Sequence, residues 1–167
     1  MTKTGAPKPS FYALEFLNRL YKERVIAEDG CLITESMRGH YKILAAHPVN
    51  MSTAYYLKEE TEISAMEIDQ MTESAQKKII HVKIGGLTAG GWQVRKYCLR
   101  QDSGSILGEW INLDLEEDIR LEEMQYLERI CTPRLFIQKY HVQSSTLEFD
   151  IVLEPNEVQY LHITEYN

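Results

Sequence analysis

The sequence predicts a mainly β domain: an antiparallel β-sandwich with an N-terminal helix and one short internal helix. Apolar and polar residues alternate in several short runs, as they do in half-buried strands. Turn signals rich in Gly, Pro, Asn and Asp separate these runs, which favours a sandwich or barrel of short strands. Helical spacing of apolar residues occurs near the N-terminus and once more in the second half of the chain.

The first 24 residues divide into a tail and a helix. Residues 1–10 form a tail with two prolines, and Ser10 is a plausible N-cap. The helix is predicted over 11–24, because an apolar stripe follows the i, i+3, i+4, i+7, i+8 pattern. The stripe consists of Ala13, Phe16, Leu17, Leu20 and Tyr21.

Residues 25–167 are predicted to form the sandwich domain. Asp29-Gly30 marks a turn, and residues 31–35 and 41–46 are predicted strands on either side of a second turn. Residues 50–77 show no clear period and are expected to be irregular, with one short element at most. No internal repeat is present.

The second half carries the clearest β signal. Residues 80–84 and 92–99 alternate on either side of a glycine-rich link and are predicted to pair as an antiparallel hairpin. A further strand is expected over 106–113 and a helix over 119–131, which Pro133 ends. Strands are predicted over 135–142, 146–153 and 158–164, with a turn at 154–157. In the middle one, Leu147, Phe149, Ile151 and Leu153 face the core.

Composition excludes several classes of function. The chain has 167 residues, 44% of them hydrophobic, with a formal net charge of -7 and a pI near 5.3. An acidic chain is repelled by nucleic-acid phosphates and by anionic membranes, so neither partner is expected. No apolar run approaches the ~20 residues needed to span a bilayer. The three cysteines are odd in number and widely spaced, which favours free thiols and a cytoplasmic location.

Few residues have the spacing of a metal site, a phosphate-binding loop or a catalytic site. The five histidines match no metal-site spacing, and the glycine-rich link lacks the Gly-Lys-Ser/Thr ending of a phosphate loop, so no metal and no cofactor is predicted. The acidic run from Asp114 to Glu123 is predicted to be the solvent-exposed N-terminal part of a helix, with calcium binding as the alternative. No catalytic residue is assigned. Trp92 is expected to be a core residue and Trp110 to pack under the following helix, which leaves Tyr55 and Tyr56 as candidate sugar-stacking residues.

Several motifs together resemble a known family. The first motif is Leu87-x-x-Gly90-Gly91-Trp92-Gln93-Val94-Arg95-Lys96-Tyr97-Cys98-Leu99. The second follows at Gly104-Ser105-Ile106-Leu107-Gly108-Glu109-Trp110. Together they resemble the C-terminal β-sandwich of glycoside hydrolase family 39. The closing Leu153-Glu154-Pro155-Asn156-Glu157-Val158 and the N-terminal Lys8 to Leu17 are similar to the same family, whose members include β-xylosidases. The Gly-Ser-Ile-Leu-x-Glu-Trp version also resembles the module found in some AraC-type transcription regulators.

The resemblance implies a non-catalytic accessory domain that supports a sugar-hydrolysing or sugar-sensing (β/α)8 barrel. The 11–24 helix would correspond to the last helix of that barrel, and the barrel itself, with its catalytic glutamates, has no counterpart in this sequence. The chain by itself is therefore not expected to be an enzyme. Its expected partners are the missing barrel and, through Phe16, Leu17 and Leu20, a second copy of the chain. An independent carbohydrate-binding module is the alternative function.

Overall fold

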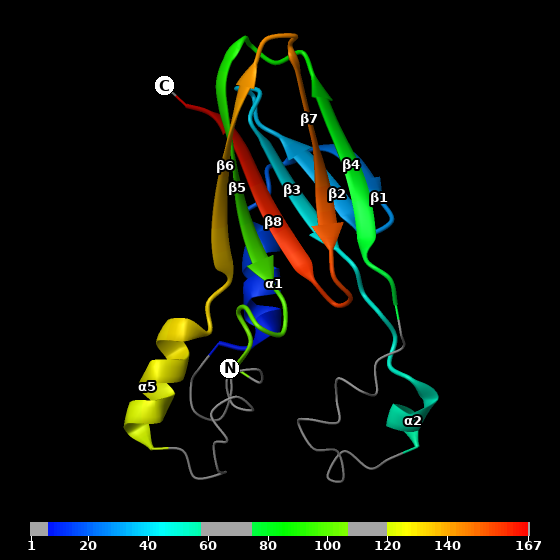
Figure 1. Ribbon diagram of the computed structural model, residues 1–167, viewed down its shortest axis with the longest axis vertical. Coiled ribbons are helices and arrows are strands. Elements are labelled where there is room, and N and C mark those ends of the chain that lie inside the picture. Colours follow the sequence, from blue (N-terminus) through cyan, green and yellow to red (C-terminus); the bar gives the residue numbers. More distant parts are fainter. Residues whose placement is uncertain (1–6, 58–74, 107–119, 167) are drawn as a thin grey trace.

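The computed structural model describes residues 7–57, 75–106 and 120–166, and these form two antiparallel sheets with a helix packed on the outside (Figure 1). The predicted fold class is confirmed: the structure is mainly β, with one helix near the N-terminus and one between β5 and β6. Its layers are a two-stranded sheet, a six-stranded sheet and the helix α1 (Pro9–Asn18).

The six-stranded sheet has the strand order β1-β2-β3-β8-β5-β6, and every neighbouring pair is antiparallel. Its strands are β1 (Glu23–Glu28), β2 (Cys31–Glu35), β3 (Tyr41–Ala46), β5 (Gly90–Leu99), β6 (Arg134–Val142) and β8 (Val158–Glu165). The predicted strands at 31–35 and 41–46 match β2 and β3. The strand β1 was not predicted, since its residues are exposed along their whole length and show no alternation.

The two-stranded sheet consists of β4 (Lys78–Gly85) and β7 (Thr146–Leu153) and covers the inner face of the large sheet. Leu147, Ile151 and Leu153 are buried and Phe149 is half-buried against the same core, which confirms the predicted core face of this strand. Facing them are the inward side chains of β3, β5 and β8, among them Ile43, Trp92, Val94, Leu161 and Ile163. Alternation along each strand thus places one apolar face toward the space between the sheets.

The predicted hairpin between residues 80–84 and 92–99 is wrong. β4 pairs with β7 in the small sheet, whereas β5 pairs with β6 and β8 in the large one. The glycine-rich link between β4 and β5 therefore crosses from one sheet to the other. At the far end of the link Gly91 lies against the Tyr166 backbone, so that an added Cβ would meet the Tyr166 oxygen at 2.9 Å. Close backbone approach is thus one role of these glycines.

The helix α1 packs on the outer face of the large sheet and builds a second core there. Tyr12 and Phe16 pack against Leu99 and Tyr160, and the rings of Phe16 and Tyr160 stack with centroids 5.3 Å apart. The helix runs from Pro9 to Asn18, not over 11–24, and its N-cap is Lys8 rather than Ser10. Tertiary hydrogen bonds replace helical ones beyond its end: Tyr21 N donates to Thr34 Oγ1 at 3.1 Å, and Lys42 Nζ donates to the Arg19 carbonyl.

Two short helices complete the described residues. The helix α5 (Leu121–Ile130) confirms the predicted internal helix and places Leu127 in the interior. The helix α2 (Thr53–Tyr56) is a single turn inside the stretch expected to be irregular. Most of the strand predicted over 106–113, and Trp110 within it, lies outside the described residues.

Candidate functional site

The outer side of α1 is the apolar surface that the fold positions most clearly. Phe11, Leu14 and Leu17 lie at i, i+3 and i+6, on the opposite side of the helix from Tyr12 and Phe16. Phe11 and Leu17 are each 46% exposed and Leu14 is 61% exposed, whereas Phe16 is 1% exposed. We call Phe11, Leu14 and Leu17 the α1 outer face.

A surface helix normally has one apolar stripe, which faces the core of its own domain. The helix α1 has two, and only one of them is covered within the described structure. The predicted stripe of Ala13, Phe16, Leu17, Leu20 and Tyr21 is therefore divided between the two sides. Phe16 is buried by its own chain and is unavailable to a second copy, while Leu17 belongs to the α1 outer face.

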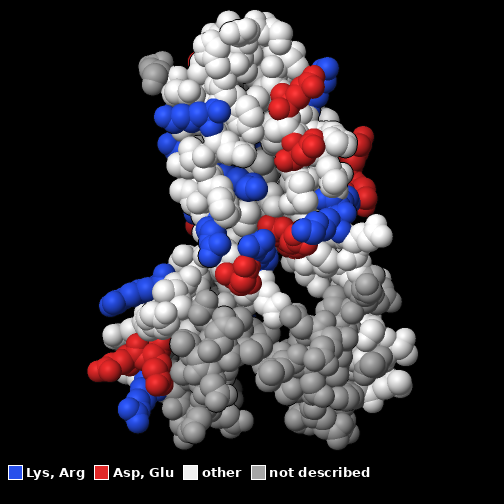
Figure 2. Space-filling view, viewed as in Figure 1, with Lys and Arg blue, Asp and Glu red and all other residues white. Residues whose placement is uncertain are grey.

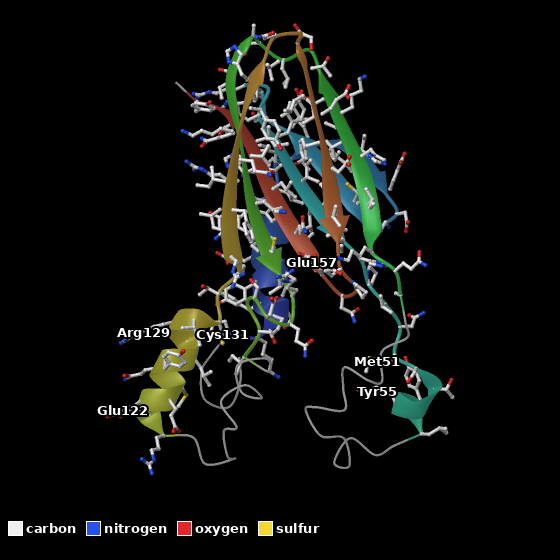
Figure 3. All side chains as sticks on the ribbon, viewed as in Figure 1. Met51, Tyr55, Glu122, Arg129, Cys131 and Glu157 are labelled. Atoms are coloured by element: carbon white, nitrogen blue, oxygen red, sulfur yellow. The ribbon has the colours of Figure 1, made fainter. Side chains whose placement is uncertain are left out.

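A buried polar cluster closes the end of the sandwich next to α1. Glu157 accepts hydrogen bonds from Glu154 N at 2.8 Å and from Gln159 Nε2 at 2.9 Å, and Gln159 Nε2 also donates to the Val152 carbonyl. Figure 3 shows Glu157 at this lower end, in the β7–β8 turn. Burial is the main cause that raises the pKa of the nearby Cys98 thiol to about 11. The cluster holds the predicted turn at 154–157 in place through fixed hydrogen bonds.

Several carboxylates of the described residues are engaged in hydrogen bonds or ion pairs. Glu157 is the one buried carboxylate among them, and the hydrogen bonds of the turn engage both of its oxygens. Asp150 and Glu148 are exposed on β7 and pair across the small sheet with His81 at 2.6 Å and Lys83 at 2.7 Å. From the side of β4 and β7, Figure 2 shows positive and negative side chains interspersed on this surface. Within the described residues no group of His, Cys, Asp and Glu could hold a metal ion.

The candidate sugar-stacking pair, Tyr55 and Tyr56, lies on α2, away from the polar cluster (Figure 3). The two rings meet edge to face, with centroids 5.5 Å apart and an interplanar angle of 85°. Tyr56 is 71% exposed and Tyr55 is half-buried. The two rings therefore do not form one flat platform, and only single ring faces can stack on a ligand.

The other residues considered from the sequence have structural surroundings. Trp92 is buried and donates from Nε1 to the Thr88 carbonyl at 3.0 Å, as expected for a core residue. Cys98 and Cys131 are buried and Cys31 is partly buried. Two of the histidines have hydrogen-bond partners of other residue types: His47 Nε2 is 2.9 Å from the Gln76 carbonyl, and His162 Nε2 is 3.2 Å from the Tyr21 hydroxyl.

Sequence reasoning missed the α1 outer face as a separate surface. The sequence contains the pattern for this surface, because Phe11 and Leu14 share the helical spacing of Leu17. Both residues lie outside the predicted stripe of the helix. None of the helices that the structure describes is long and apolar enough to cross a bilayer.

Comparison with known proteins shows which proteins this chain is similar to. No family model matches the chain. In sequence the chain is 18% identical over 159 residues to an uncharacterized HTH-type transcriptional regulator of Staphylococcus aureus (strain COL), covering 95% of this chain and 20% of the regulator. The corresponding regulator of strain MRSA252 matches to the same extent. The chain thus spans about a fifth of the length of these relatives.

Solved structures resemble the chain over nearly its whole length. A GH39 enzyme from Xanthomonas axonopodis pv. citri matches with a TM-score of 0.72 and 15% identity, over 97% of this chain and 31% of the enzyme. A monomeric β-xylosidase from Caulobacter crescentus CB15 matches with a TM-score of 0.73 and 15% identity, over 99% of this chain and 32% of the enzyme. The resemblance inferred from the sequence motifs is thereby confirmed: this chain has the fold of about one third of a glycoside hydrolase family 39 enzyme.

Proposed function

We propose that this chain is a non-catalytic accessory β-sandwich domain of a glycoside-hydrolase-family-39-like protein. Its role is to support a sugar-hydrolysing or sugar-sensing barrel that the chain does not contain. The observation that carries the proposal is the helix α1, which is apolar on two sides and covered on one. The part of the parent protein that this chain lacks would cover the other side.

The lengths of the relatives support this assignment. The chain corresponds to 31% and 32% of the two enzymes named above, so about two thirds of a parent of that kind would lie outside it. Burying a Phe or Leu side chain contributes roughly 1.5–3 kcal/mol, so docking the α1 outer face on another domain is favourable. An interface of this kind needs a central apolar cluster, which Phe11, Leu14 and Leu17 provide.

The parent protein is either a xylosidase-like enzyme or an AraC-type regulator, and the match to HTH-type regulators favours the second. We place it in the cytoplasm on the composition of the chain. A carbohydrate-binding role through Tyr55 and Tyr56 is the less favoured function, because the two rings are nearly perpendicular.

The test uses the remaining part of the parent polypeptide, produced separately and mixed with this chain. Wild-type chain should form a 1:1 complex, and the double substitution Leu14→Asp and Leu17→Asp should abolish it while the chain keeps its circular dichroism spectrum. Val152→Asp, at an exposed apolar position of the small sheet, is the matched control and should bind like wild type.

Two outcomes would overturn the proposal. One is a homodimer of the chain alone that dissociates on the Leu14→Asp and Leu17→Asp substitution, which would make a second copy the occupant of the α1 outer face. The other is release of nitrophenol from aryl β-xylosides by the purified chain, if substitution of a single Asp or Glu in this chain abolishes it.

A further inference from the structure

A row of basic side chains crosses the outer face of the six-stranded sheet beside α1. Lys42 of β3 is the Cα partner of His162 on β8, and Arg95 of β5 is the partner of the same His162. The three side chains share the face on which Leu44 and Tyr160, two residues away along their strands, pack under α1. We call Lys42, His162 and Arg95 the cationic row.

Within the described residues, no ion pair neutralises the cationic row. Among the described residues no carboxylate forms an ion pair with Lys42 or Arg95. On the small sheet, in contrast, Lys83 faces Glu148 and His81 faces Asp150 across the two strands. Lys42 and Arg95 place two positive charges on this face, on either side of the neutral His162, and a bound anion would interact favourably with both.

The side chains of the cationic row are held in place and keep hydrogen-bond donors available. Lys42 Nζ donates to the Arg19 carbonyl and lies 4.1 Å from the centroid of the Tyr21 ring. His162 Nε2 is 3.2 Å from the Tyr21 hydroxyl; when that hydroxyl donates to Nε2, the Nδ1–H of a neutral imidazole remains available. Arg95 is exposed and forms no ion pair within the described structure.

The electrostatics of His162 agree with a positive local field. Burial, which is the main cause, together with the nearby charges of Lys42, His40 and Arg95, lowers the pKa of His162 to about 4. In the next row of the same face, Gln93 Nε2 donates to Thr164 Oγ1 at 3.2 Å, which adds uncharged polar groups beside the cations.

We propose that the cationic row is a binding site for an oxyanion, a phosphate or carboxylate group carried by a small molecule. Lys42 and Arg95 would flank the anion from two strands, and His162 between them would donate a hydrogen bond to it. Lys42 and His162 are half-buried, which favours a small anionic group over an extended acidic protein surface. The uncharged neighbours Gln93, Thr164 and Tyr21 suit the hydroxyl groups of a polar ligand such as a sugar phosphate or a sugar acid.

The experiment titrates the purified chain with inorganic phosphate, glucose 6-phosphate and glucuronate, and with glucose as the neutral reference. The imidazole signals of His162 in two-dimensional NMR report binding at the site itself. At least one of the three anions should bind saturably and glucose should not. The stronger of glucose 6-phosphate and glucuronate identifies the anionic group.

Substitutions test whether the anion binds at the cationic row. Arg95→Gln, at an exposed position, and Lys42→Met should each weaken the affinity by about tenfold, the effect of losing one charge-assisted hydrogen bond. Lys83→Met removes the same charge from the opposite sheet and should leave the affinity unchanged. Equal affinities in Arg95→Gln and wild type, or the absence of saturable binding by any of the three anions, would each overturn the proposal. The site lies apart from the α1 outer face, so its result is independent of the proposed function.

Discussion

Single buried polar residues fix the ends of strands in this protein. Glu157 and Gln159 are both almost fully buried and share a hydrogen bond of 2.9 Å, while the Ser103 hydroxyl donates to the Cys98 carbonyl and accepts from Arg134 N, each at 2.8 Å. Such groups cost free energy when buried without partners, so their bonds determine where the chain turns. Gln159 Oε1 is the buried side-chain atom of the described residues that has no partner.

His162 gives the fold a dependence on pH at the acidic end. Its pKa is about 4 in the folded chain against an ordinary value of 6.5, so the neutral imidazole stabilises the fold above pH 6.5, and this contribution is lost as the pH falls from 6.5 toward 4. Because the side chain is half-exposed, we expect a loss on the order of 1 kcal/mol.

Urea unfolding at a series of pH values between 7.5 and 4 measures this contribution. His162→Gln should unfold with a shallower decrease in free energy over this range than wild type. His141→Gln, at an exposed position of β6, should keep the wild-type slope. Equal slopes in wild type and His162→Gln would show that the burial of His162 does not couple to folding.

At the scale of the elements, β3, β5 and β8 differ from the other strands because they are covered on both faces. Tyr160 packs under α1, while its neighbour Leu161 packs against the small sheet. In β5 the same division separates Leu99 from Trp92 and Val94. The absence of strict alternation in these strands follows from their central place between two cores.

The two sides of α1 should respond differently to truncation. Phe16→Ala should lower the free energy of unfolding by about 3–5 kcal/mol, because Phe16 is fully buried between the helix and β8. Leu17→Ala should lower it by about 0.5 kcal/mol or less, because Leu17 is largely exposed. Chemical denaturation of the two variants and wild type checks the difference. A large loss with Leu17→Ala would mean that the α1 outer face is already covered in the isolated chain.

The whole molecule has two apolar cores that share strands. The core between the sheets and the core under α1 draw their side chains from opposite faces of β3, β5 and β8. Loss of either core removes support from the same three strands, so the two should unfold together.

A single transition is therefore expected in urea. Far-ultraviolet circular dichroism, which follows the sheets, and tryptophan fluorescence, which includes Trp92 in the core between the sheets, should give the same midpoint and the same m-value. Separate midpoints for the two signals would show that the chain does not unfold as one cooperative unit.

The sequence by itself determined the fold class and most element positions. Alternation of polar and apolar residues, together with the turn signals between the runs, located β2, β3, β6, β7 and β8 to within a residue or so. Helical spacing located α5, and the motifs around Gly90-Gly91-Trp92 and Gly104-Ser105-Ile106 led to the right fold family. These are local properties, readable within a window of a few residues.

The tertiary structure alone decided the pairing of strands and the surfaces that follow from it. β4 pairs with β7, far away in the sequence, instead of its neighbour β5, because two apolar sheet faces must cover each other and local periodicity does not specify which strands do so. The end of α1 at Asn18 depends on hydrogen bonds from Tyr21 and Lys42 to partners outside the helix. The cationic row likewise exists only through the register of β3, β8 and β5, which brings together three residues that no sequence window contains.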